Sequence, residues 1–243
     1  MSQPAIRLLV NSREDFAHKS SSLPWLIEGF LPAGVVTGVV GAPLSGKSSL
    51  AFHLAKAVGV GEGFAGRKLH GTARKVLWIS AEDGWAAEMQ ERGERGWTWL
   101  DVVPEESVNL LMPSDNDRLD FVQWWGKLAD EMNKAGDYGL VVVDHLLGFL
   151  TSRSSEGIDR PQSMGPFLTA LGQLARSTGC AVLLIHHENK SGGTMGSVNF
   201  GVRTRGTIAV RRNKRTGGVS VSVEGNRIKS LHYSVQNFAP SYL

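Results

Sequence analysis

The sequence has almost no cysteine, since Cys180 is the only one among 243 residues. A disulfide within the chain is therefore excluded, which fits a reducing compartment. No apolar run approaches the ~18 residues that a membrane-spanning helix needs. The polar N-terminal stretch, residues 1–22, has no apolar segment of the kind found in signal peptides. We therefore expect a cytoplasmic protein that does not associate with membranes.

Acidic residues are nearly missing from the C-terminal part of the chain. Residues 196–243 contain eight basic residues and a single acid, Glu224, so this part carries a net charge of +7. Because the whole chain carries +3, residues 1–195 carry −4. Charge segregated in this way indicates an anionic partner for the C-terminal part. The alternative is a basic hairpin that is only solvated.

Short apolar segments alternate with helical segments over most of the chain. Such alternation is typical of a mostly parallel sheet with helices on both faces, so we expect an α/β fold. The glycine-rich turn after the first strand leads into a helix that ends at 59–61, and Pro161 stands at the first turn of the last helix. The predicted strands are 34–40, 75–80, 107–111, 140–144 and 180–187, and the later predicted helices are 84–93, 121–134 and 161–177.

The pattern changes after residue 206, where apolar and polar residues alternate in three segments separated by glycine-containing turns. Residues 206–234 are therefore predicted to form a basic antiparallel β meander that closes one edge of the sheet. We expect residues 1–23 to be an N-terminal extension and residues 24–243 to form one domain. Two irregular stretches, 148–160 and 190–201, are long enough to be functional loops.

The stretch "GAPLSGKS" matches the phosphate-binding pattern G-x-x-x-x-G-K-[ST] in full, and it lies between a predicted strand and a predicted helix. Its glycines allow the backbone N–H groups to surround an anion, and the helix N-terminus adds partial positive charge. We expect ATP here, with Lys47 at the β- and γ-phosphates and Ser48 on Mg²⁺. The predicted nucleotide-binding residues are Gly41, Ala42, Pro43, Leu44, Ser45, Gly46, Lys47, Ser48 and Ser49.

A second magnesium ligand is predicted at Asp144, because it follows the apolar strand "LVVV". In many nucleotide hydrolases a glutamate comes next and positions the attacking water, but here the next residue is His145. Glu82 and Asp83 follow the strand 75–80, and ligands bind at the carboxyl ends of parallel strands. If that strand neighbours the phosphate-binding strand, Glu82 is the catalytic base, Asp83 its substitute and His145 structural. Alternatively, the two acids only favour the start of the next helix.

The motifs "GAPLSGKSS", "ISAEDG", "LVVVDH" and "LLIHHENKSGG" occur here in the order seen in RecA-type ATPases. Over roughly residues 24–210 the chain most resembles the RepA-like hexameric helicases of plasmids and phages. The resemblance implies a RecA-like core, catalysis by Glu82 and a γ-phosphate sensor at His187 rather than His186. It also implies a ring of subunits, in which an arginine enters the neighbouring ATP site.

Arg205 is the best positional match for this arginine, with Arg203 as substitute, and Arg92 is a weaker match to another family arginine. The family's channel loops, which hold single-stranded DNA, correspond to 148–160 and 190–201. The second of these is nearly uncharged apart from Lys190, which weakens the helicase interpretation more than the ATPase one. A RecA-type recombinase or annealing protein, or a nucleotide-dependent switch with a protein partner, remain the alternatives.

Overall fold

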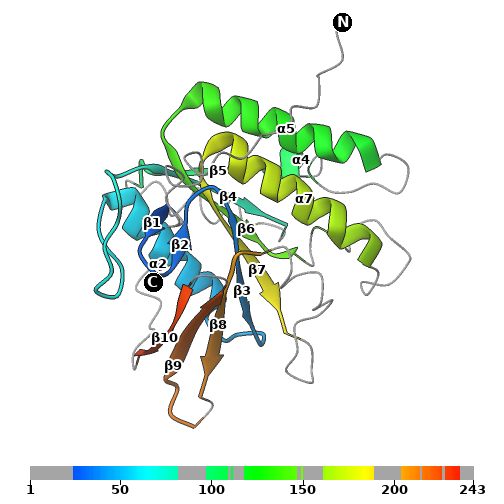
Figure 1. The fold of residues 1–243 in the computed structure, drawn as a ribbon. Helices are drawn as coiled ribbons and strands as arrows, with labels where there is room; N and C mark the ends of the chain where they lie inside the picture. The colour runs from blue at the N-terminus through cyan, green and yellow to red at the C-terminus, as the bar shows by residue number, and fades with distance from the viewer. Residues whose placement is uncertain are drawn as a thin grey trace, which may run out of the picture.

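The computed structural model describes residues 24–81, 97–108, 111, 118–146, 149, 161–188, 204–213, 215–225 and 228–235. Its centre is an eight-stranded sheet with the order β10-β9-β8-β3-β7-β6-β4-β5 (Figure 1). The strands are β3 (Val36–Gly41), β4 (Lys75–Ser80), β5 (Leu100–Val102), β6 (Tyr138–Asp144), β7 (Ala181–His187), β8 (Gly206–Arg212), β9 (Val219–Gly225) and β10 (Ile228–Val235). The expected N-terminal extension, residues 1–23, lies outside the described residues.

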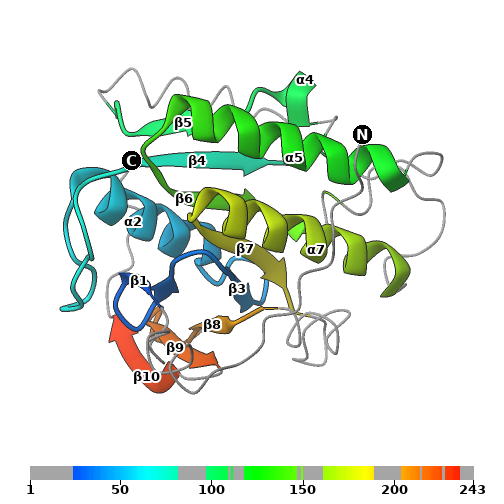
Figure 2. The same cartoon turned by 45° about the horizontal axis from the view of Figure 1, so that its top comes forward.

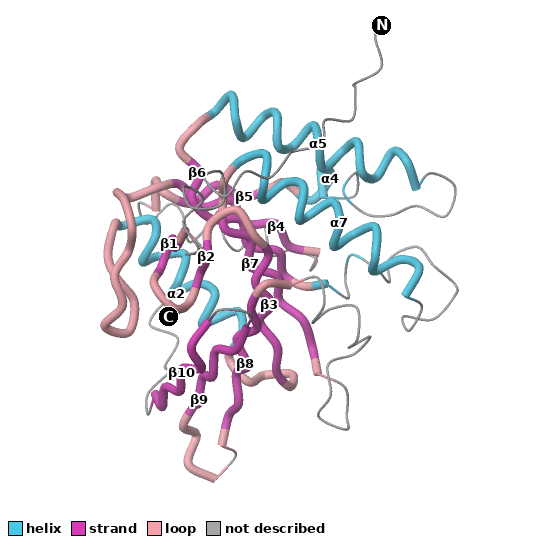
Figure 3. Tube along the Cα trace, in the orientation of Figure 1, coloured by secondary structure: helices cyan, strands magenta, loops and turns pink. Residues whose placement is uncertain are grey.

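The strands from β8 to β5 in this order all run parallel, whereas β9 and β10 are antiparallel to their neighbours. The expected α/β fold is therefore confirmed, including the antiparallel meander at the C-terminal edge. Because β3 and β8 are parallel neighbours, the loop after β3 and the turn after β8 leave the sheet at the same end (Figure 3).

Helices cover both faces of the sheet, as Figure 2 shows. On one face α5 (Arg118–Ala135) and α7 (Pro161–Thr178) lie side by side, and α2 (Lys47–Val60) covers the other. The central strands alternate between the two layers: on β6, for example, Val141 and Val143 pack under α5 and α7, whereas Leu140 and Val142 pack under α2. This two-sided burial explains the continuous apolar runs, because neither face of a central strand meets water.

A small hairpin precedes the sheet. It pairs β1 (Trp25–Ile27) with β2 (Leu31–Pro32), and its apolar side chains join the core on the α2 face. No described helix is both long enough and apolar enough to cross a lipid bilayer.

The expectation of a strand at 107–111 is wrong. The chain forms the short strand β5 at Leu100–Val102 and then the helical turn α4 (Glu105–Val108). Pro104 starts this turn, because its carbonyl oxygen accepts the backbone N–H groups of Ser107 and Val108 at 2.9 and 3.1 Å. The apolar pattern reflects burial of Val108 and Leu111 from helical backbone rather than from a strand. The predicted helix 84–93 lies outside the described residues.

The strands that carry the phosphate loop and the "ISAEDG" motif are not neighbours, so the condition under which the sequence placed Glu82 at the γ-phosphate is not met. Strands β7 and β6 lie between β3 and β4. The strand β4 pairs with β6 instead, and Ser80 lies opposite Asp144 in register. The chain therefore leaves β4 beside Asp144, on the side of β6 away from β3.

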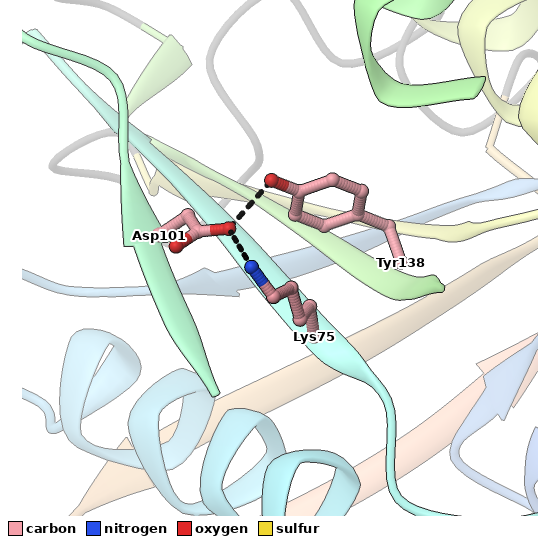
Figure 4. Close-up of polar contacts among 3 residues, drawn as sticks. All are labelled: Lys75, Asp101 and Tyr138. Carbon is pink, nitrogen blue, oxygen red and sulfur yellow. Dashed lines mark hydrogen bonds and ion pairs between the residues drawn. The ribbon is translucent and has the colours of Figure 1, made fainter. Parts of the chain in front are cut away.

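The edge strand β5 is fastened by a polar cluster at the end of the sheet far from the phosphate loop. Asp101 Oδ2 accepts hydrogen bonds from Lys75 Nζ at 3.1 Å and from the Tyr138 hydroxyl at 2.6 Å (Figure 4). These residues come from β5 and from the first positions of β4 and β6. The cluster ties together the amino ends of three neighbouring strands.

Four tryptophans, at positions 97, 99, 124 and 125, mainly pack within the fold. Trp125 is buried, donates from Nε1 to the carbonyl oxygen of Leu111 at 3.0 Å, and contacts the Phe149 and Phe167 rings. Trp97 and Trp99 pack beside Phe52 of α2. Trp124 is half-buried, with the Lys127 ammonium 3.9 Å from the centre of its ring.

Candidate nucleotide-binding site

The loop between β3 and α2 has the geometry that its two glycines require. Gly46 stands immediately before α2 with a φ of 99°, a left-handed conformation that suits glycine. Gly41 ends β3, where an added Cβ atom would lie 2.4 Å from the Val210 carbonyl oxygen and 2.7 Å from Ser45 Oγ. Gly46 is therefore needed for its backbone angle, and Gly41 for close approach of β8.

The lysine of this loop points back across it. Lys47 is 4% exposed, and its Nζ donates a hydrogen bond to the Ala42 carbonyl oxygen at 2.8 Å. The ammonium group is thereby fixed beside the start of α2, whose N-terminus also favours anions. Ser45 Oγ is buried and has no hydrogen-bond partner among the described residues. Because a buried hydroxyl without a partner costs about 1–3 kcal/mol, Ser45 indicates that the loop is built for a polar ligand.

A pocket of about 520 Å³ opens over the loop at the carboxyl ends of the parallel strands. Its volume lies within the range of small-molecule sites, and its position is where open α/β sheets bind ligands. Two other groups join the loop in its wall: residues from β6 and β7, and residues from β8 and β9. The lining residues are Pro43, Leu44, Ser45, Gly46, Lys47, Ser48, Ser49, Asp144, Ile185, His187, Arg212 and Val219.

Strand alternation explains which polar side chains reach this pocket. On β7, Leu183 and Ile185 belong to the core under α2, so His187 continues that face and lines the pocket. His186 has the opposite parity and is fully buried. Asp144 follows Val142 on the same face of β6 and is 3% exposed. The resemblance implied His187 rather than His186, and it is His187 that lines the pocket together with the loop.

His187 carries a perturbed imidazole. Burial, and to a smaller extent the nearby charges of Lys47, His145 and His186, together lower the pKa of His187 to about 4. The ring is therefore neutral near pH 7 and can donate one hydrogen bond and accept another. Its Nδ1 atom is buried without a hydrogen-bond partner among the described residues. The His145 ring packs edge to face against it, with the ring centres 4.7 Å apart.

The residues of the pocket fit a magnesium ion that is bound together with phosphates. Ser48 and Asp144 both line it and offer a hydroxyl and a carboxylate oxygen, the hard ligands that Mg²⁺ prefers. The described part of the chain contains no cluster of three or more His, Cys, Asp or Glu that could hold a metal without such help. One or two protein oxygens plus substrate phosphates is the usual arrangement for Mg²⁺.

Other predicted site residues lie elsewhere or outside the described part. Arg205 is exposed at the start of β8, where its backbone N–H donates to the Val36 carbonyl oxygen at 2.9 Å, at the end of the sheet opposite the pocket. Glu82, Asp83, Arg92 and Arg203 lie outside the described residues. So do the loops 148–160 and 190–201, apart from Phe149, which is buried against Trp125.

Three residues that line the pocket, Ile185, Arg212 and Val219, are not among the predicted site residues. Arg212 and Val219 face each other in the register of β8 and β9. The alternation of Ile208 and Val210 on β8 could have placed Arg212 on the α2 face, but it could not have placed β8 beside β3. That pairing is a tertiary contact between segments far apart in the sequence.

Residues 3–193 match the AAA domain family. None of the curated proteins compared with this chain matches it significantly. Among solved structures, the crystal structure of the RadB recombinase superposes with a TM-score of 0.55 at 18% identity, over 83% of this chain and 87% of that one. At this identity the similarity concerns the fold. The chain thus belongs to the AAA domain family, and its core has a RecA-like fold.

Proposed function

We propose that the protein is a ring-forming motor that hydrolyses ATP with Mg²⁺ and acts on single-stranded DNA, as RepA-like helicases do. The observation that carries the ATPase part is the pocket itself. It gathers a buried lysine, a serine hydroxyl, a buried aspartate and a neutral histidine at the end of a parallel sheet. These groups match the needs of phosphoryl transfer, which depends on positioning and on charge stabilisation.

Each residue has a distinct role in this proposal. Lys47 binds the β- and γ-phosphates, and Ser48 and Asp144 hold Mg²⁺. Glu82 accepts the proton of the attacking water, the role that the resemblance to RecA-type ATPases implies for it. It follows β4 in the sequence, and the last residue of β4, Ser80, is the register partner of Asp144. His187 senses the γ-phosphate through a ring nitrogen, and the contact with His145 orients its imidazole.

The ring is proposed because Arg205 lies at the wrong end of β8 to reach the pocket of its own chain. An arginine that stabilises charge developing on ATP would then have to enter from a neighbouring subunit. The basic C-terminal part, with a net charge of +7, supports an anionic partner such as DNA.

The test is the rate of ATP hydrolysis with and without single-stranded DNA, on a sample whose mass is recorded in the presence of ATP. The proposal expects hydrolysis that DNA accelerates, together with a mass of several subunits. Hydrolysis by a monomer at a rate that DNA does not change would contradict the proposed motor function and favour a nucleotide-dependent switch.

A recombinase or annealing protein is the second candidate, and the fold similarity to the RadB recombinase favours it. Strand separation distinguishes the two. A helicase unwinds a forked duplex while it hydrolyses ATP. A recombinase or annealing protein pairs complementary strands but leaves such a fork intact.

A further inference from the structure

Among the described residues, Arg212 is the one cationic side chain in the wall of the pocket formed by β8 and β9. Its position follows from the strand pattern. Ile208 and Val210 of β8, and Val221 and Val223 of β9, all lie in the core under α2. Arg212 continues the β8 row beyond the core, and it faces Val219, the buried residue at the end of the β9 row, in register. Both therefore line the pocket, whereas Arg211 has the opposite parity and does not.

Arg212 lies beside the phosphate loop, because β8 extends past the last residue of β3. In the pairing of β3 with β8, Val40 lies opposite Ala209, and β3 ends one residue later at Gly41. Arg212 is three residues beyond Ala209, so its backbone passes the point where β3 gives way to the loop. The close approach of Gly41 to the Val210 carbonyl group fixes this arrangement.

The turn that follows Arg212 is held by its own hydrogen bonds. Asn213 Oδ1 accepts the backbone N–H groups of Arg215 and Thr216 at 2.9 and 3.1 Å. The backbone N–H of Asn213 donates to the Gly218 carbonyl oxygen at 2.8 Å, and that of Gly217 donates to the Asn213 carbonyl oxygen at 2.8 Å. The backbone that carries Arg212 is therefore ordered before any ligand arrives, which lowers the entropic cost of using its side chain.

The polar and charged side chains around the pocket lie on two sides of β3. Strands β7 and β6, with His187 and Asp144, lie on one side of β3, and β8 with Arg212 lies on the other. Lys47 lies between them at the start of α2. Among the described residues no carboxylate forms an ion pair with Arg212, whose side chain is exposed. A guanidinium presents paired N–H donors that match phosphate oxygens.

We infer that Arg212 binds the phosphates of the nucleotide held by its own chain, from the flank opposite Asp144. The inference rests on the proposed nucleotide site and adds to it a phosphate ligand that the P-loop pattern does not contain. In this arrangement Lys47 and Arg212 share the negative charge of the polyphosphate, and Asp144 is left to the metal. Arg212 thus acts within one subunit, unlike the role proposed for Arg205.

The test is calorimetric titration of wild-type, Arg212→Ala, Arg212→Lys and Arg211→Ala proteins with ADP and with tripolyphosphate, which has no base or ribose. Loss of a hydrogen-bonded charge should weaken both ligands about ten- to hundredfold in Arg212→Ala. Arg212→Lys should recover part of this loss, because it keeps the charge without the paired donors. Arg211→Ala removes an equal charge one residue away on the other face, and it should bind both ligands like wild type.

Three results would overturn the inference. Unchanged affinity in Arg212→Ala would show that the side chain does not bind the nucleotide. Weaker binding of ADP with unchanged binding of tripolyphosphate would show that Arg212 contacts the base or ribose. An equal loss of affinity in Arg211→Ala would show that the effect comes from the net charge of the protein rather than from the position of Arg212. If wild-type protein bound neither ligand, the proposed nucleotide site itself would fail. Thermal midpoints within a degree or two of wild type establish that the variants are folded.

Discussion

Arg205 immediately precedes strand β8 and Arg212 is its last residue, so Arg205 lies beside the start of β3 and Arg212 at the pocket where β3 ends. Seven residues of extended strand separate their Cα atoms by about 23 Å. Only Arg212 can therefore act on a nucleotide bound to its own chain. Any part that Arg205 plays in hydrolysis requires a second copy of the chain.

This geometry predicts complementation between two inactive variants. Glu82→Gln should bind ATP but lose about 10²–10⁴ in turnover, because the amide cannot accept a proton from water. Arg205→Ala should also lose turnover, by about 10³–10⁵, with nearly unchanged nucleotide affinity. In mixed assemblies, an intact Glu82 on the ATP-holding subunit meets an intact Arg205 from its neighbour at some interfaces. Mixing the two should therefore restore hydrolysis, measured as phosphate release.

The control for this experiment is proof that the two variants assemble together, for example from the mass of differently tagged subunits. Assemblies that contain both variants yet stay inactive would show that Arg205 does not act on the ATP held by a neighbouring subunit. The arginine would then have to be sought at Arg203.

Two glycines allow a matched test of the phosphate loop. Gly41→Ala should destabilise the fold by about 1–3 kcal/mol and abolish nucleotide binding, because the new methyl group would meet the Val210 carbonyl oxygen and force the backbone apart. Gly126→Ala makes the same change inside α5, where an added Cβ meets nothing within 4 Å. It should stabilise the fold by about 0.5–1 kcal/mol. Denaturant unfolding with and without ADP measures both effects. Normal ADP binding by Gly41→Ala would contradict the close packing of the loop.

His187 should make stability depend on pH in the acidic range. The pKa of its imidazole is about 4 in the folded protein, against 6.5 for an unperturbed histidine, chiefly because it is buried. Between these two values the unfolded chain binds a proton that the folded chain does not. The free energy of unfolding should therefore be highest above about pH 6.5 and fall as the pH drops toward 4.

Replacing His187 should make the free energy of unfolding depend less on pH in the acidic range. His187→Gln cannot bind the proton in the unfolded state, so its unfolding free energy should decrease less than that of wild type between about pH 7 and pH 4.5. His70→Gln, at an exposed position, controls for the loss of a histidine. Parallel curves for wild type and His187→Gln, from urea unfolding at each pH, would rule out the low pKa.

The local sequence pattern was sufficient to predict most of the fold and the loop that lines the pocket. The strand at 75–80 and the helix that begins at Pro161 have the predicted bounds to within a residue or so, because buried β-branched runs and helix-start signals are local. The strand β5, only three residues long, has too little periodicity to predict. The order of strands, which separates β4 from β3 and brings Arg212 beside Gly41, depends on tertiary pairing that no local motif encodes.

The most direct test of the central claim, that this pocket binds and hydrolyses ATP, is the turnover of ATP by wild-type protein and by Lys47→Ala in the presence of Mg²⁺. Lys47 is buried in the loop with its ammonium on the Ala42 carbonyl oxygen, whereas Lys56 on the same helix is exposed. The account predicts hydrolysis by wild type and by Lys56→Ala, and none above background by Lys47→Ala, measured as phosphate release on folded samples. Near wild-type turnover by Lys47→Ala would contradict it.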